Sequence, residues 1–380
     1  MNKKAKYSAF SLFASAFTAC LSFQVLPASA ALFVSNTEGN NILTFDEKNG
    51  EFIGELIAPN TGGLLSPDDL NFGPDGNLYI SSGTTPETSA ILRFDSKTGE
   101  FLDVFASGNG LFRPYGAAFG PDGYLYVSSF LSDEILRFDA TTGEFFDVFA
   151  SGNGQPGGLN GPNDLLFGPD GDLYVTTQGS IAVDGTPDFS AGLPSQVLQF
   201  DTTTKTSTVF VDQPTPSPDS FGFVSFLGLA LGPDKNLFVS DFANDIRRYN
   251  LETGELVDTL STNYTGTVPS NNFIGNITLS PDNILYTVGF DITNNNLGSI
   301  LRYDAITGEP LPSEGSNNAV FVPTDSNLLR PIGITFVSQV PSSVPEPTSI
   351  LGFMILGFWG LSSYFKRGYH AKSAQKKYQR

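Results

Sequence analysis

Oxygen-bearing side chains recur where apolar strands begin at regular spacing along the chain. Six of them share this position or the end of an adjacent strand: Asp68, Asp69, Asn163, Asp164, Asp241 and Asn276. Carboxylate and amide oxygens are the ligands that a hard cation such as Ca²⁺ prefers. Two interpretations follow: these residues hold Ca²⁺ at the mouth of a channel, or they are solvated residues that cap backbone amides at the strand starts.

Other catalytic chemistry is limited by residue types that the middle of the chain lacks. Among 380 residues, Cys20 is the single Cys and His370 the single His, and they stand in an N-terminal apolar stretch and a basic C-terminal tail. The middle therefore has no thiol nucleophile, disulfide, imidazole base, or Cys or His metal ligand. The sequence leans against an enzyme and leaves carboxylates, amides, hydroxyls, phenols and a few lysines for any reaction.

The charge of the chain is concentrated in its middle. Residues 31–344 contain 11 basic and 38 acidic side chains, a formal charge of −27. Such a polyanion repels a nucleic acid backbone and attracts cations, so we expect no nucleic acid partner. The alternative is that the charge only keeps an exported protein soluble.

An internal repeat supplies the elements that must position these side chains. The 40 Gly, 25 Pro and 34 Phe residues already indicate an all-β protein. Gly-Pro-Asp-Gly or a close variant begins at Gly73, Gly120, Gly168, Gly232 and Ser280. An aromatic strand follows each copy, then a strand that ends in Arg-Phe-Asp or a variant, and in most repeats a Thr-Gly-Glu turn and a fourth strand.

Each repeat predicts a four-stranded antiparallel sheet with two apolar faces, which it cannot bury alone. The chain begins with three strands that lack a first strand, at 32–34, 41–46 and 51–57, and ends with a first strand alone, at 331–336. Joined, these four strands complete one more repeat. The sequence therefore predicts a six-bladed β-propeller over residues 31–340, its last blade closed by the N- and C-terminal strands.

Alignment of the first strands places the oxygen-bearing residues in two adjacent columns. The first column is Asp68, Tyr115, Asn163, Leu227, Gly275 and Ile332, and the second is Asp69, Gly116, Asp164, Gly228, Asn276 and Gly333. We expect both columns at the channel mouth on the face that carries the long loops, 83–90, 178–195, 213–225, 291–298 and 310–330. One variable rim on a rigid scaffold is typical of a binding face.

At these residues the chain resembles the NHL-repeat and gluconolactonase-like propellers. That family binds its metal through a Glu and through Asn and Asp residues of Pro-Asn-Gly or Pro-Asp-Gly motifs. Pro67-Asp68 and Pro162-Asn163 match the first two letters of the motif, whereas Asp69 and Asp164 stand where the family has Gly, and no counterpart of the Glu is found. The resemblance implies ion binding and, as an alternative function, a metal-dependent lactonase or related hydrolase that uses Asp68, Asn163 and Asp164.

The N-terminus has the features of a secretory signal peptide. Residues 1–30 contain an early cluster of lysines, an apolar stretch and the small residues Ala28-Ser29-Ala30, so cleavage is expected after Ala30. A lipoprotein signal with lipidation at Cys20 is the competing interpretation.

The C-terminus predicts a membrane anchor. A linker at 341–347 ends in Pro345-Glu346-Pro347 and precedes an apolar stretch, 348–365, that is long enough to span a bilayer. The basic tail, 366–380, should stay in the cytoplasm. A buried C-terminal helix is the alternative.

Pro-Glu-Pro, an apolar helix and a basic terminus together resemble the PEP-CTERM sorting signal, which an exosortase reads in the inner membrane of Gram-negative bacteria. The resemblance implies a protein anchored in that membrane and then delivered to the cell surface or extracellular matrix. The sequence thus favours an exported propeller that binds an extracellular polysaccharide or a surface protein through its loop face.

Overall fold

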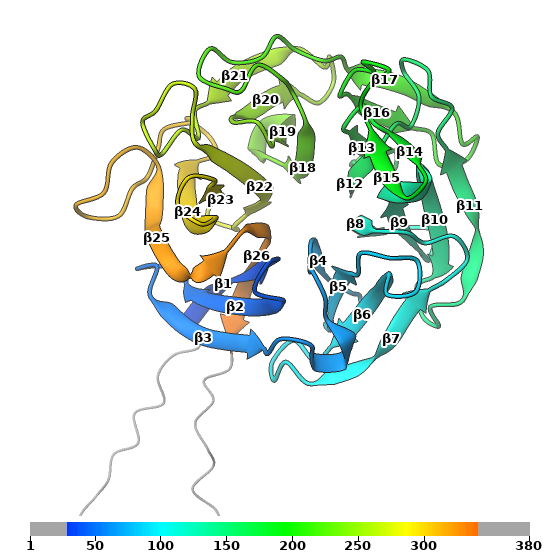
Figure 1. The fold of residues 1–380 in the computed structure, drawn as a ribbon, viewed down its shortest axis with the longest axis horizontal. Coiled ribbons are helices and arrows are strands. Elements are labelled where there is room, and N and C mark those ends of the chain that lie inside the picture. Colours follow the sequence, from blue (N-terminus) through cyan, green and yellow to red (C-terminus); the bar gives the residue numbers. More distant parts are fainter. Residues whose placement is uncertain (1–28, 341–380) are drawn as a thin grey trace, which may run out of the picture. The chain divides into compact units, whose positions relative to one another are not determined.

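The computed structural model describes residues 29–340, which form six four-stranded antiparallel sheets arranged as blades around a central channel (Figure 1). The predicted all-β, six-bladed propeller is confirmed. A two-stranded hairpin is added to one blade.

The blades are numbered here in chain order, with the composite blade last, and their strands are given from the channel outward. Blade 1 contains β4 (Leu70–Phe72), β5 (Leu78–Ser82), β6 (Ala90–Phe94) and β7 (Phe101–Ser107). Blade 2 contains β8 (Pro114–Phe119), β9 (Tyr124–Ser129), β10 (Glu134–Asp139) and β11 (Phe145–Ser151). Blade 3 contains β12 (Pro162–Phe167), β13 (Leu173–Thr177), β16 (Val197–Phe200) and β17 (Ser207–Val211). Blade 4 contains β18 (Phe226–Leu231), β19 (Asn236–Asp241), β20 (Ile246–Asn250) and β21 (Leu256–Leu260). Blade 5 contains β22 (Asn272–Leu279), β23 (Ile284–Asp291), β24 (Leu297–Asp304) and β25 (Val320–Leu329). Blade 6 contains β26 (Pro331–Val340), β1 (Ser29–Asn36), β2 (Asn41–Asp46) and β3 (Phe52–Ile57).

Pairing between the two chain ends closes the ring. The C-terminal strand β26 lies innermost and pairs antiparallel with β1, with Val34 opposite Ile334. Strand β1 begins at Ser29, which pairs with Val340, so the strand starts two residues before the expected mature terminus at Ala31.

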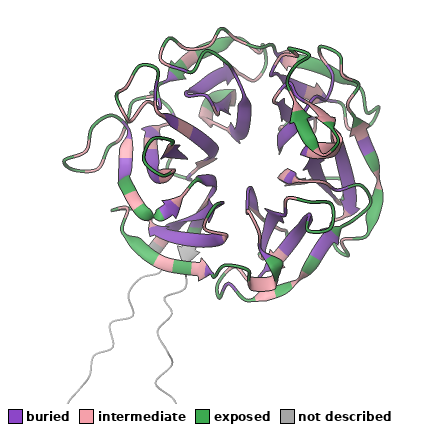
Figure 2. Ribbon diagram, viewed as in Figure 1, coloured by how far each residue is buried: buried purple, intermediate pink, exposed green. Residues whose placement is uncertain are grey.

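The core lies between the blades. The buried apolar residues form six clusters, each made by two neighbouring blades, and Figure 2 shows the burial concentrated on the inner strands. Large rings from the second strands, such as Tyr126 and Tyr174, are fully buried there. Because every blade buries both faces against its neighbours, opening the ring at any point would expose the apolar faces of the two blades at the opening.

The repeated turn motif also pins the repeated Tyr. In Gly-Pro-Asp-Gly of blade 2, the Tyr126 hydroxyl donates to the Asp122 carboxylate over 2.8 Å. Arg137 from the Arg-Phe-Asp segment pairs with Asp147 of the outer strand at 2.7 Å and lies 3.5 Å from Asp122. The equivalent arginines of blades 1 and 4, Arg93 and Arg248, likewise pair with Asp103 and Asp258 of the outer strands.

One expected loop contains regular structure. Within 178–195, β14 (Ile181–Val183) and β15 (Thr186–Asp188) form a hairpin. Its turn residues, Asp184 and Gly185, have φ of 48° and 74°. Asp-Gly is a favoured pair for such a left-handed hairpin turn, which is the signal that could have predicted it.

The predictions for the two ends fall largely outside the described part of the chain. The signal segment up to residue 28, the Pro345-Glu346-Pro347 motif and the expected span at 348–365 are not described. Within residues 29–340, no helix has the length and apolar character needed to cross a membrane.

Candidate ligand-binding site

Two cavities lie along the channel. The larger, about 650 Å³, opens on the face of the long loops and has the size of a small-molecule site. Its lining includes five of the six residues of the first column: Asp68, Tyr115, Asn163, Leu227 and Ile332. The smaller, about 230 Å³, lies further along the same strands and is lined by Asp69, Asp164 and Asn276 of the second column.

The two columns therefore face different cavities rather than one common mouth. Asp68 lines the larger cavity, whereas its neighbour Asp69 lines the smaller one. Asn163 and Asp164 are separated in the same way.

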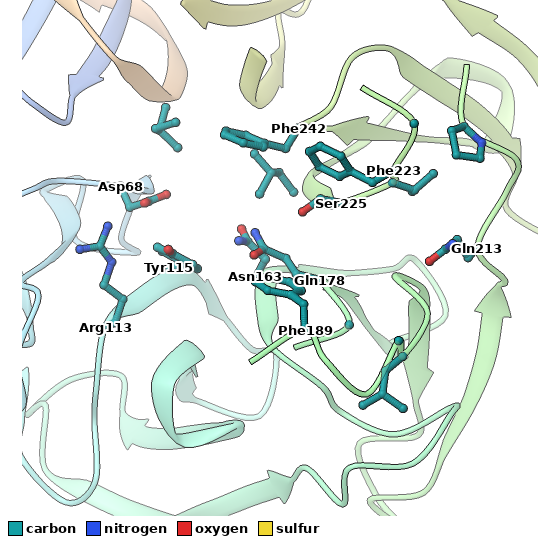
Figure 3. Close-up of a pocket in the computed structure, with 18 of the residues that line it drawn as sticks. Asp68, Arg113, Tyr115, Asn163, Gln178, Phe189, Gln213, Phe223, Ser225 and Phe242 are labelled. Carbon is teal, nitrogen blue, oxygen red and sulfur yellow. The ribbon is translucent and has the colours of Figure 1, made fainter. Parts of the chain in front are cut away.

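Charged side chains gather at one end of the larger cavity. Asp68 at the start of blade 1 stands between Arg113 of blade 2 and Arg330 of blade 6, and all three line the cavity. Figure 3 shows Asp68, Arg113 and Tyr115 together on one side. The Arg113 guanidinium lies 5.3 Å from the centre of the Tyr115 ring.

Burial dominates the electrostatics of Asp68. The pKa of the carboxyl is raised to about 7, chiefly by burial and to a smaller extent by the charge of Asp69, while Arg113 and Arg330 oppose the rise. No side-chain hydrogen bond to the Asp68 carboxylate is found within residues 29–340, so its oxygens can accept from a ligand.

Two amides line the middle of the cavity. The side chains of Asn163 and Gln178 lie near the centre of the cavity, to one side of Asp68 and Arg113 (Figure 3). Among the described residues, neither amide has a hydrogen-bond partner. Each can donate and accept, as recognition of hydroxyl groups requires.

Aromatic rings also line the cavity: in Figure 3, Phe242 and Phe223 lie above the two amides and Phe189 lies beside them. Phe242, which follows β19, stacks on Phe273 of β22 with centroids 4.4 Å apart, and Phe223 packs against the same ring at 6.4 Å. Phe189 follows the β14–β15 hairpin and is 52% exposed. The hairpin is held by Asp133, whose carboxylate accepts from the Gly161 and Ala182 amides at 2.8 and 2.6 Å.

The second column connects neighbouring blades. The Asp69 carboxylate of blade 1 accepts from the Ala117 amide of blade 2 over 3.1 Å. The Asp164 carboxylate of blade 3 accepts from the Leu229 amide of blade 4 over 2.7 Å and from its own neighbour, Leu165, over 2.8 Å. Burial raises the pKa of Asp69 to about 6, and burial followed by the charge of Asp69 raises that of Asp164.

The glycines that alternate with these carboxyls have a steric role. A Cβ atom at Gly116 would lie 2.7 Å from the Asp164 Cα, and one at Gly228 would lie 2.8 Å from the Asn276 Cα. Such contacts are too short, so only glycine lets the inner strands approach this closely. Asn276 completes the column, and its buried Oδ1 has no partner in the described chain.

Asp241 is engaged elsewhere. Its carboxylate pairs with Arg247 at 2.6 Å and accepts from the Ser225 and Ala243 amides. Within the described residues, no group of three or more Asp, Glu, His or Cys side chains that could hold a metal ion is found. Ca²⁺ binding stays a prediction whose candidate ligands are divided among separate places.

Several lining residues were missed by the sequence reasoning: Arg113, Gln178, Phe189, Phe223, Phe242 and Arg330. The arginines had a usable signal, because each immediately precedes the Pro that begins an inner strand, Pro114 or Pro331. The others come from loops of irregular sequence, in which spacing predicts no position.

Comparison with known proteins supports the fold alone. No family model and no curated protein sequence match the chain. A structure titled as the nidogen/laminin complex shares 14% identity with a TM-score of 0.54, covering 82% of this chain and 99% of that one. A protein of unknown function from Bacteroides caccae shares 13% with a TM-score of 0.53, covering 82% and 100%. Virginiamycin B lyase from Staphylococcus aureus shares 16% with a TM-score of 0.46, covering 83% and 93%.

Proposed function

We propose that the protein is an exported binding propeller that holds an extracellular polysaccharide in the larger cavity. The observation that carries this proposal is the lining of that cavity. The lining combines two sets of side chains. One set is a carboxylate and two amides that have no side-chain hydrogen-bond partner among the described residues, and the other is a group of exposed aromatic rings. Hydroxyl groups suit the first set, and the apolar face of a sugar ring suits the second.

A polysaccharide fits the cavity better than a folded protein does. The site is concave and has the volume of a small-molecule pocket, whereas protein interfaces are broad and of standard size near 1,600 Å². A polymer can place one or two sugar units in such a pocket while the remainder continues over the long loops.

Export is part of the proposal and follows from the two ends of the sequence. The signal peptide ending at Ala30 and the Pro345-Glu346-Pro347 motif support secretion, recognition by an exosortase and delivery to the cell surface or matrix. Until it is processed, the protein would be anchored through 348–365 in the inner membrane.

The alternative, a Ca²⁺-dependent lactonase, is less well supported by the geometry. A cation at Asp68 and Asn163 would meet one carboxylate flanked by the guanidinium groups of Arg113 and Arg330. Calcium sites usually supply several anionic or carbonyl oxygens, so this lining does not fit the ion.

Binding of the full-length, detergent-purified protein to a panel of bacterial polysaccharides tests the proposal. We expect Phe189→Ala to weaken retention of the bound polymer. Phe146→Ala is the matched control, because Phe146 is equally exposed, at 51% against 52%, but lies on the outer strand β11. The proposal would be overturned if both variants lost polysaccharide binding equally, or if the unmodified protein retained no polysaccharide. Capture of a surface protein in place of any glycan would also overturn it.

A further inference from the structure

The larger cavity is positively charged although the protein is a polyanion. Residues 31–344 have a formal charge of −27. The Asp, Glu, Lys and Arg residues that line the cavity are Asp68, Arg113 and Arg330, so the two guanidinium groups exceed the single carboxyl. A neutral sugar needs no such excess, and the surrounding negative charge would otherwise repel an acidic one.

Arg113 has no counter-ion among the described residues, a lack that it shares with Arg302, whose guanidinium donates instead to the Leu311 carbonyl over 2.9 Å. Arg93, Arg137, Arg247 and Arg248 each have a carboxylate within 3.5 Å, and Arg330 has Glu38 at 3.8 Å. For Arg113, no carboxylate within ion-pair distance is found anywhere in residues 29–340. Its guanidinium is held over Tyr115 beside the cavity.

The backbone at both arginines is in an unfavourable conformation. Arg113 has φ of 55° and Arg330 φ of 49°, and each precedes a proline. A side chain other than glycine rarely adopts positive φ, and such strain concentrates at functional sites when the surroundings enforce it. Here the Arg113 amide donates to Ser89 Oγ over 2.9 Å and the Arg330 amide donates to the Asn296 carbonyl over 2.8 Å.

The same turn recurs before other inner strands, where its first residue carries no charge. Ser66 and Gly161 also have positive φ directly before a proline, in blades 1 and 3. The fold therefore does not require arginine at this position. Arginine occurs in the two blades that flank Asp68.

We propose that the polysaccharide bound in this cavity is acidic and that the carboxylate of a uronic acid unit binds Arg113, with Arg330 as a second cationic contact. This inference rests on the proposed function and names its ligand class. A planar guanidinium matches a carboxylate in a bidentate geometry. A ring hydroxyl then reaches Asp68 or the amides of Asn163 and Gln178, while the apolar face of a sugar lies toward Phe223 and Phe242.

A carboxylate fits this site better than a more highly charged group. Asp68 lies between the arginines and adds a negative charge when ionised. It therefore limits how much anionic charge the site accepts, which favours a singly charged acid over a phosphate ester.

The test compares two ligands that differ only at the carboxyl group, which is ionised in one and methylated and neutral in the other: oligogalacturonate and its methyl ester, titrated calorimetrically into the full-length protein in detergent. We expect the acid to bind about tenfold or more tightly than the ester, as an added charged hydrogen bond would give. Arg113→Gln should remove this preference, so that the ratio of the acid affinity to the ester affinity falls to about one. Lys48→Gln, which removes one positive charge from an exposed turn, should keep the preference.

A further titration with free galacturonate, the monosaccharide, distinguishes a monomer from a polymer as the source of the carboxylate. We expect the oligomer to bind more tightly than the monosaccharide. Equal affinity for acid and ester would overturn this inference while the proposed function stands. A preference that survives Arg113→Gln in a variant with unchanged melting temperature would also overturn it. Failure of every polysaccharide to bind would instead overturn the proposed function.

Discussion

Asp164 of blade 3 accepts a hydrogen bond from the backbone amide of Leu229 in blade 4, with the two heavy atoms 2.7 Å apart. Leu229 follows Gly228 in the chain. Asn163, which immediately precedes Asp164, lines the larger cavity. One inner strand thus binds its neighbour with one side chain and presents the preceding side chain to a ligand.

Loss of this connection should destabilise the propeller. Asp164→Ala leaves the buried Leu229 and Leu165 amides without their acceptor, so we expect the free energy of unfolding to fall by about 1–3 kcal/mol. Urea unfolding measures it. Asp282→Ala, in an exposed turn, is the control and should change stability by less than about 0.5 kcal/mol. Equal stability of the Asp164 variant and the wild type would show that the hydrogen bond is not needed.

Substitution of Asp68 should raise the free energy of unfolding, the opposite of the effect expected at Asp164, because the substitution removes no side-chain hydrogen bond. Its folded-state pKa is raised to about 7 from 3.8, so the folded protein binds the proton more tightly than the unfolded chain. The stabilisation that comes from this tighter proton binding is complete below pH about 4 and is lost as the pH rises to about 7. We therefore expect Asp68→Asn to stabilise the protein by about 1–3 kcal/mol at pH 8, and by much less near pH 4.

Urea unfolding of both proteins at pH 4.5, 6 and 8 checks this difference. In the wild type, Asp69 and Asp164 change stability in the same direction as Asp68, since burial raises their pKa values too. Stability should consequently rise on mild acidification from pH 8 toward pH 4.5. A destabilising Asp68→Asn at pH 8 would contradict the assignment of Asp68 as an unpartnered buried acid.

The hairpin beside the cavity should depend on Asp133. Asp133→Ala removes the acceptor for the Gly161 and Ala182 amides, and Ala182 lies in the first strand of the hairpin. We expect faster chymotryptic cleavage after Phe189, by several-fold. Mass spectrometry of the fragments locates the cut, and Asp282→Ala again serves as control. Unchanged cleavage would mean that other contacts hold the hairpin.

The repeat made most of the fold predictable, because turn chemistry is local. Gly-Pro-Asp-Gly placed each first hairpin correctly, and the unmatched strands at the two ends identified the closing blade. The site was less predictable. Asp68 and Asp69 were assigned to one mouth, although the two residues line different cavities. Arg113 and Phe242 come together only through tertiary structure, so no local pattern joins them.

Closure by β26 should be essential for folding. Removal of residues 331–380 deletes the strand that pairs with β1 and takes Ile332, Ile334 and Val337 out of the core. It would leave β1 with an unpaired edge and its buried side chains exposed to water, which favours aggregation. We expect no cooperative melting transition and elution as aggregates in size-exclusion chromatography. Removal of 341–380 alone keeps β26 and should leave the melting temperature unchanged. A cooperative transition in the shorter protein would mean that five blades with an open sixth are stable, which contradicts the dependence of every blade on two neighbours.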